Sequence, residues 1–269
     1  MAVHLHADDL GLHPSVDRAI FRAFEGGAIA GASLLVTGPT FHEAARQARA
    51  LRLPTSLHLA LVDERPVSPP AEVPSLIDAD GRFPPTFSAV AGRALLGRLR
   101  QADLRLEIGR QVEAFAGADL VGNAGLVVDG HQHLHLLPPV VAVLLESARR
   151  FGLTAIRLPR RSPTERRERS ARALGFVVAE RLGRRAAAAA AAQRIATIPC
   201  WGVLYAGHLT VDRARAVLAS LPSDATGQLL CHPGDDDRAL GACHAWGYAW
   251  EGDLSTIMRL ASEPDPSRS

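Results

Sequence analysis

Residues 125–135 read GLVVDGHQHLH, an apolar run followed at once by three histidines spaced two residues apart. Side chains alternate between the two faces of an extended strand, so this spacing predicts that His131, His133 and His135 point the same way. Imidazoles gathered on one face can bind a metal ion. The same residues could instead be hydrogen-bonded core histidines at a polar strand end. The triplet alone leaves both interpretations open.

A second cluster lies near the start of the chain, where residues 3–11 read VHLHADDLG. Two carboxylates held side by side raise each other's pKa unless a cation relieves the repulsion, so one aspartate can bind a cation while the other acts as a base. The alternative is that Asp8 or Asp9 caps the following helix. Pro14 or Ser15 is the better candidate for that role.

Two further apolar runs end in a histidine. Residues 56–61 read SLHLAL and contain His58, which on its own is more typical of a core residue than of a ligand. Residues 228–234 read QLLCHPG, in which His232 is followed by turn-forming residues. Four separate strands therefore deliver His or Asp where a loop begins. Parallel α/β barrels collect their catalytic residues in this way.

The predicted fold is α/β, a single-domain (β/α) barrel over residues 1–262. The barrel is expected to resemble a TIM barrel, either in its regular form or in an irregular or incomplete one. Its metal site is expected at the C-terminal ends of the strands, and residues 263–269 are expected to form a flexible tail. A chain of 269 residues with 47% hydrophobic content is long enough to bury one such core.

Elsewhere, strand-like runs alternate with helical periodicity, which is typical of parallel βα units. The expected helices cover residues 16–24, 41–51, 87–99, 103–116 and 139–151, and the remaining strands cover 31–36 and 154–157. A proline-rich excursion spans residues 66–85, and the alanines at 186–192 extend a surface helix. The arginine-rich residues 160–169 are interpreted as a solvated helix, or else as a patch facing anionic lipid headgroups.

Composition restricts the class of partner. A formal net charge of +2 gives no broad basic face, so nucleic acid is not expected as a partner. Cys200, Cys231 and Cys243 form no Cys-x-x-Cys pair, and the first residues lack the pattern of a signal peptide, so we expect a cytoplasmic protein. Trp201 or Trp246 is expected either to pack in the core or to form a sugar subsite near His232.

The order and rough spacing of four segments resemble the signature motifs of the YdjC-like carbohydrate deacetylases. They are ADDLG at 7–11, the lone histidine at 58, the run 129–135 followed by Pro138, and CHPG at 231–234. Residues 13–16, 62–67 and 69–74 look most like the hopanoid biosynthesis-associated HpnK branch. The chain departs from the family pattern in two places, since His6 stands where Asn or Thr is usual and Leu10 stands where Phe is common. An extra imidazole there could add a ligand or alter the base.

The resemblance implies a set of roles. One divalent metal ion, magnesium or zinc, would be held by Asp9, His58 and His131. Asp8 would act as general base and His232 as general acid. His133 and His135 would either contact the sugar or support the metal ligands from behind. Arg157 would lie beside the substrate and orient Asp8 through a bidentate ion pair.

The implied activity is hydrolytic N-deacetylation of an N-acetylglucosamine unit, on a hopanoid glycolipid in the HpnK branch. An enzyme acting on that lipid is expected to contact the inner membrane peripherally. The protein is also expected to form a homodimer. The near alternative is a soluble chitooligosaccharide deacetylase. Two others are a silent sugar-binding barrel, which would not need both aspartates, and a metal-dependent ester or phosphate hydrolase.

Overall fold

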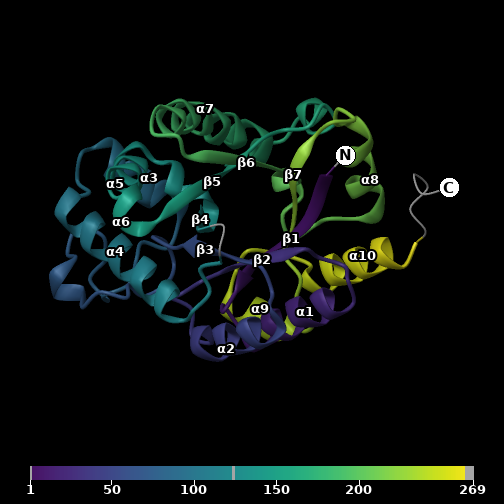
Figure 1. The fold of residues 1–269 in the computed structure, drawn as a ribbon, viewed down its shortest axis with the longest axis horizontal. Helices are drawn as coiled ribbons and strands as arrows, with labels where there is room; N and C mark the ends of the chain where they lie inside the picture. The colour runs from purple at the N-terminus through teal and green to yellow at the C-terminus, as the bar shows by residue number, and fades with distance from the viewer. Residues whose placement is uncertain (1, 123–124, 264–269) are drawn as a thin grey trace.

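Seven parallel strands, each paired with its neighbours in chain order, close into a barrel when β7 pairs with β1 (Figure 1). The computed structural model of the protein describes residues 2–122 and 125–263. The strands are β1 Ala2–Leu10, β2 Gly31–Leu34, β3 Thr55–Leu59, β4 Leu126–Gly130, β5 Leu153–Pro159, β6 Ala196–Trp201 and β7 Thr226–Cys231. The predicted α/β barrel of irregular TIM type is therefore confirmed, with seven strands over the described residues.

Helices surround the barrel (Figure 1). They are α1 Pro14–Glu25, α2 Phe41–Leu51, α3 Phe87–Leu95, α4 Gln101–Gly117, α5 Pro138–Glu146, α6 Ala148–Phe151, α7 Ala171–Ala192, α8 Val211–Ser220, α9 Asp237–Cys243 and α10 Trp250–Ser262. Four 3-10 turns accompany them, at Pro70–Glu72 (η1), His131–Leu136 (η2), Glu165–Arg167 (η3) and Val203–Tyr205 (η4). α1, which follows β1, buries an apolar stripe made of Val16, Ala19, Ile20 and Ala23.

The strand predicted through residue 135 is shorter than expected. β4 ends at Gly130, and His131–Leu136 form η2, in which Gln132 and His133 have left-handed backbone angles. The chain turns back so tightly that a Cβ on Gly130 would lie 2.7 Å from Nδ1 of His135. The prediction that the three histidines share one strand face is therefore wrong. Their spacing in the sequence does not reveal that the chain turns at Gly130 and places the His135 ring against it.

The arginine-rich residues 160–169 do not form the predicted helix. Only η3 is helical, and Glu165 within it is fully buried. Its carboxylate accepts hydrogen bonds from the backbone N–H of Ser162 and Gly202, which draws the segment inward. The expected helix over 139–151 is likewise divided into α5 and α6 at Ser147. Within the described residues, no helix is long and apolar enough to cross a membrane.

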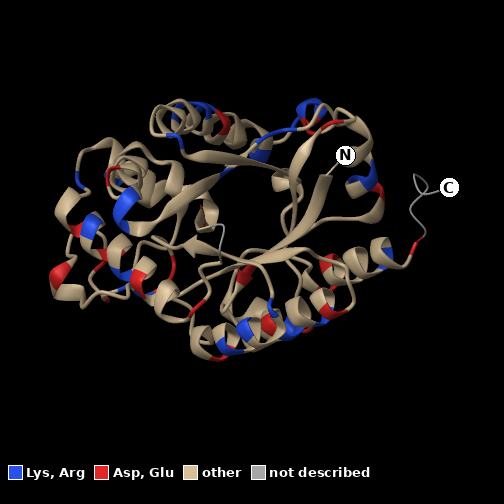
Figure 2. Ribbon diagram, in the orientation of Figure 1, with Lys and Arg blue, Asp and Glu red and all other residues tan. Residues whose placement is uncertain are grey.

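Acidic and basic residues are interspersed along the outer helices rather than gathered on one face (Figure 2). This distribution agrees with the near-balanced composition. The three cysteines are all free, as expected. Of the predicted tail, only Glu263 falls within the described residues, and residues 264–269 lie outside them.

Candidate active site

A cavity of about 330 Å³ opens at the C-terminal ends of the strands. The residues with metal-binding or acid–base chemistry that line it are Asp8, Asp9, His58, His131, His133 and His232. They come from the ends of β1, β3 and β7 and from η2, which follows β4. The closure of the barrel thus brings together groups that are far apart in the sequence.

A distortion in β1 lets two adjacent aspartates face the same cavity. Neighbouring side chains of a regular strand point to opposite faces. Here the register of β1 against β2 shifts between Ala7 and Leu10, and Asp9 has a φ of 72°. Such a left-handed conformation costs a non-glycine residue about 1–3 kcal/mol and is characteristic of functional sites. The bulge turns both carboxylates into the barrel mouth.

Asp9, His58 and His131 form a buried triad, as the sequence predicts. Oδ1 of Asp9 lies 2.9 Å from Nδ1 of His131 and 3.3 Å from Nε2 of His58. One ligand atom from each residue lies within 4.8 Å of the others. One carboxylate and two imidazoles are donors that suit a divalent cation and leave coordination positions open. Asp9 therefore does not cap α1, whose N-cap is His13.

Asp129 holds the far side of His58. Its Oδ1 lies 2.5 Å from Nδ1 of His58, while its Oδ2 accepts hydrogen bonds from the hydroxyls of Ser33 (2.7 Å) and Ser56 (2.6 Å). A carboxylate in this position fixes the ring orientation of a metal-binding histidine and leaves its other nitrogen free for the metal. Asp129 is not among the predicted site residues, although a carboxylate just before the end of an apolar strand is a usable signal for such a role.

The charges of the site favour a cation. Burial raises the pKa of Asp129, but Arg157 and His58 outweigh it and hold that pKa below its ordinary value. The pKa of Asp9 is likewise held low by His131 and His58 against the effect of burial. Burial lowers the pKa of His58, and the neighbouring Asp129 and Asp9 reverse this and raise it to about 10. The ionised carboxylates of Asp9 and Asp129 keep a proton on His58. A divalent metal ion can replace that proton and supply the positive charge that the carboxylates attract.

Asp8 has a different partner. Nη1 and Nη2 of Arg157 donate to its two oxygens at 2.7 and 2.6 Å, and both side chains are buried. Burial raises the pKa of Asp8, but the adjacent guanidinium outweighs it and keeps the carboxyl ionised. Asp8 therefore does not cap a helix either. It lines the cavity as a fixed carboxylate beside the triad.

The other two histidines of the triplet occupy separate positions. His133 lines the cavity, with its ring centroid 6.5 Å from that of Phe176. His135 lies behind the cavity wall, where its Nε2 donates to the carbonyl oxygen of Arg157 at 2.8 Å. Its position supports the backbone of β5 and gives no support to the predicted contact with substrate.

His232 stands at the end of β7, across the cavity from the triad. Its backbone N–H donates to Oδ2 of Asp253 at 2.9 Å, and its Nδ1 has no hydrogen-bond partner among the described residues. Burial lowers the pKa of the His232 imidazole, although Asp9 and Asp8 oppose the shift. Asp253, on α10, was not found by sequence reasoning because nothing near it in the chain indicates its contact with β7.

Aromatic and apolar side chains complete the wall. The Tyr248 ring lines the cavity, with its centroid 5.3 Å from that of His232. The Trp246 ring packs against His131 and Tyr248 at centroid distances of 5.2 and 5.5 Å and is not part of the cavity lining. Trp201, the other tryptophan proposed for a subsite, is buried in the core instead. Phe87 of α3 and Phe176 of α7 provide an apolar side to the cavity.

Comparison with known proteins gives consistent results. A model of the family described as YdjC-like protein matches residues 2–261. The chain is similar to "Carbohydrate deacetylase" of Homo sapiens, with 37% identity over 59% of this chain and 49% of that protein. The protein of the same name from Geobacillus stearothermophilus is 29% identical over 88% of this chain and 81% of its own length. The chain thus spans about half the length of the human relative.

A solved structure from Enterococcus faecalis V583 has a similar fold. That protein is provisionally named a cellobiose-phosphate cleavage protein. Its TM-score with this chain is 0.69, at 21% identity, over 97% of this chain and 93% of the other. At this identity the likeness concerns the fold alone.

Proposed function

The chain belongs to the YdjC-like family, and on that premise we propose that it is a metal-dependent carbohydrate deacetylase that hydrolyses the acetamide of an N-acetylglucosamine unit. The observation that carries the proposal is the single cavity that holds the Asp9–His58–His131 triad, the separate carboxylate of Asp8 and the imidazole of His232. A hydrolytic centre needs a cation site, a base and an acid around one bond.

Asp9, His58 and His131 would hold the divalent ion, magnesium or zinc. When bound, such an ion supplies Lewis-acid polarisation of the acetamide carbonyl and acidifies a water molecule. The donor set favours zinc over magnesium because imidazole is a better ligand for zinc than for hard cations. Asp129 contributes by fixing the ring of His58.

The remaining chemistry belongs to the protein's own side chains. Asp8, held by Arg157, accepts a proton from the attacking water as the new C–O bond forms at the carbonyl carbon. His232 then donates a proton to the nitrogen as the C–N bond breaks. The products are acetate and the free amine of the sugar. Tyr248, which lines the cavity, offers a ring against which a sugar can stack.

For the substrate, we propose an N-acetylglucosaminyl hopanoid, deacetylated at the cytoplasmic surface of the inner membrane. The resemblance to the HpnK branch supports this choice, and so does the apolar side of the cavity formed by Phe87, Phe176 and Leu204. A short chitooligosaccharide would have less need of such a wall. Arg160, Arg167 and Arg169 are exposed in the segment that follows β5 and would attract anionic headgroups. Arg161 and Arg166 instead form ion pairs with Glu180.

The test combines metal analysis with acetate release. The purified protein is expected to release acetate from an N-acetylglucosaminyl hopanoid faster than from diacetylchitobiose, and to lose activity with a chelator. Phe176→Ala should weaken turnover of the lipid-linked substrate more than that of diacetylchitobiose, which serves as the internal control. Efficient cleavage of diacetylchitobiose with no response to the lipid would refute the hopanoid substrate. Release of phosphate or an alcohol without acetate would refute deacetylation itself.

A further inference from the structure

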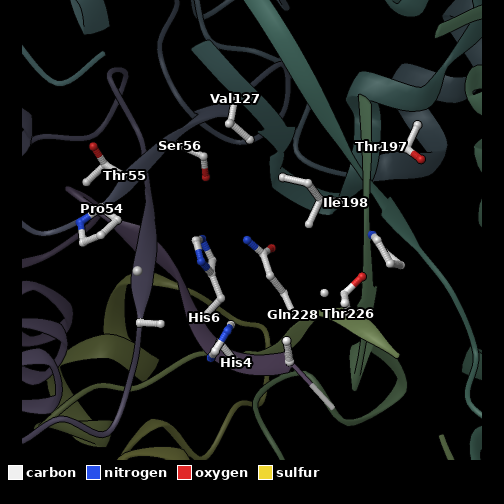
Figure 3. Close-up of a pocket in the computed structure, with 15 residues that line it drawn as sticks. His4, His6, Pro54, Thr55, Ser56, Val127, Thr197, Ile198, Thr226 and Gln228 are labelled. Atoms are coloured by element: carbon white, nitrogen blue, oxygen red, sulfur yellow. The ribbon is translucent and has the colours of Figure 1, made fainter. Parts of the chain in front are cut away.

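A second cavity, of about 420 Å³, lies at the opposite end of the barrel. Its lining includes His4 and His6 of β1, Thr55 and Ser56 at the start of β3, and Gln228 of β7. Figure 3 shows His6 and Gln228 side by side, both pointing into it. Barrels of this type usually fill their interior with branched apolar side chains. Here polar side chains occupy the space beneath the triad.

Three hydrogen bonds connect this second cavity to His58. Nε2 of His6 lies 2.9 Å from the hydroxyl of Ser33. That hydroxyl donates to Oδ2 of Asp129 at 2.7 Å, and Oδ1 of Asp129 lies 2.5 Å from Nδ1 of His58. All four residues are buried. The chain of contacts thus runs from the second cavity to the buried triad.

The hydrogen count at Ser33 determines which atom donates. A serine hydroxyl has one hydrogen and two lone pairs. The Ser33 and Ser56 hydroxyls lie 3.0 Å apart, and each has Oδ2 of Asp129 within reach as an acceptor. When both hydrogens go to Asp129, one lone pair of Ser33 accepts from Nη1 of Arg157 at 3.2 Å. The remaining lone pair of Ser33 can then accept from His6, and this arrangement assigns His6 the tautomer with its proton on Nε2. Burial lowers the pKa of His6 to about 4, which leaves the ring neutral with Nδ1 bare.

We infer that His6 is a positioning residue for the metal site. Its Nε2–H holds the Ser33 hydroxyl in the orientation that donates to Asp129, and Asp129 in turn fixes the ring of His58. Outer partners of this kind change metal affinity by about 10- to 100-fold when they are removed. The inference deepens the proposed function and rests on the proposed metal site. It gives a purpose to the histidine that stands where the resemblance leads us to expect Asn or Thr.

The first experiment replaces His6 by two residues of similar size. His6→Gln keeps an N–H donor at about the reach of Nε2, whereas His6→Met fills the space without a donor. Each variant is titrated with Co²⁺ alone, and binding is followed by visible absorption, with thermal unfolding measured in parallel. We expect the dissociation constant to rise about tenfold in His6→Met and to stay within about twofold of wild type in His6→Gln.

The second experiment tests whether free imidazole can enter the second cavity and replace a deleted His6 side chain. His6→Ala should weaken Co²⁺ binding, and added imidazole should restore it by entering from the N-terminal end of the barrel. His4→Ala is the matched control, because His4 lines the same cavity and is exposed. Wild type with the same imidazole measures any direct binding of imidazole to the metal. If His6→Ala does not fold, the Gln and Met pair still decides the question.

The outcomes separate the inference from the function on which it rests. Equal Co²⁺ affinity in His6→Met, His6→Gln and wild type would overturn the positioning role while leaving the metal site intact. An equal loss in His4→Ala would also overturn it, since a general effect of the cavity would then be responsible. If the wild-type protein binds no Co²⁺, or if Asp9→Asn binds Co²⁺ as tightly as wild type, the proposed metal site itself is wrong.

Discussion

Asp8 and Asp9 are neighbours in the sequence, yet their carboxylates have separate partners. Asp9 faces His58 and His131, whereas both oxygens of Asp8 accept from Arg157. Asp8→Asn should therefore keep the metal while activity falls by about two to four orders of magnitude, the usual contribution of a general base. Asp9→Asn should lose metal affinity as well. Metal analysis and acetate release on both variants test this, and equal loss of metal in the two would show that the roles are wrongly divided.

Asp253 gives a residue-level prediction about pH. Burial raises its pKa to about 7, although the N–H groups of His232 and Leu209 oppose the shift. A carboxyl whose pKa is higher in the folded state stabilises the fold most below its unfolded pKa, and this contribution is lost as pH rises through about 7. Between about pH 4 and 7, the free energy of unfolding should fall by up to ~1.4 kcal/mol per pH unit because of this group.

The measurement compares denaturant unfolding of wild type and Asp253→Asn at several pH values in that window. The variant lacks the titrating group, so its destabilisation relative to wild type should shrink as pH rises. The carboxyls with lowered pKa, such as Asp129, act only at lower pH and do not obscure the comparison. Parallel pH profiles for the two proteins would contradict the prediction.

At the scale of single elements, the sequence predicts regular pieces well and their ends less well. α2 was predicted with its observed bounds because its apolar stripe has an unbroken helical period. The extent of β4 was missed because the turn at Gly130 depends on the His135 ring packing over it, a contact that period-2 spacing does not encode. The strand pattern indicates a metal site at the strand ends, and the choice of Asp9, His58 and His131 comes from the resemblance to the YdjC-like motifs. His6, Ser33, Asp129 and Asp253 act through partners far along the chain, so no local pattern marks them.

The end of α2 provides a test of helix termination. Arg52, its C-cap, has left-handed angles of φ 55° and ψ 35°, a conformation that favours glycine. Gly152 occupies the equivalent place after α6. Arg52→Gly should raise the free energy of unfolding by about 0.5–1 kcal/mol, whereas the control Ala50→Gly, inside the same helix, should lower it by about 1 kcal/mol. Denaturant unfolding measures both. A loss of stability in Arg52→Gly would show that the arginine side chain contributes more than its backbone strain costs.

At the scale of the whole molecule, the proposed metal should stabilise the folded barrel, because its ligands come from β1, β3 and the segment after β4. A ligand that binds only the folded state stabilises it by about 2.7 kcal/mol at 100 times its Kd. For a chain of this size, that corresponds to a rise in Tm of about 5–10 °C. Differential scanning calorimetry with Zn²⁺ and with a chelator should show the rise in wild type. The Asp9→Asn variant, measured by thermal unfolding in the same buffers, should show no rise in Tm.

The pairing of β1 with β7 joins Ala2 to Thr226, nearly opposite ends of the chain. During synthesis, β1 emerges first and must wait with one edge open until β7 has left the ribosome. The three proposed metal ligands all lie before residue 132, so the nascent chain carries them long before the barrel can close, while His232 arrives last. A chain synthesised only as far as β4 and η2 would thus contain all three proposed ligands, whereas the proposed general acid joins the site only when β7 pairs with β1 and closes the barrel.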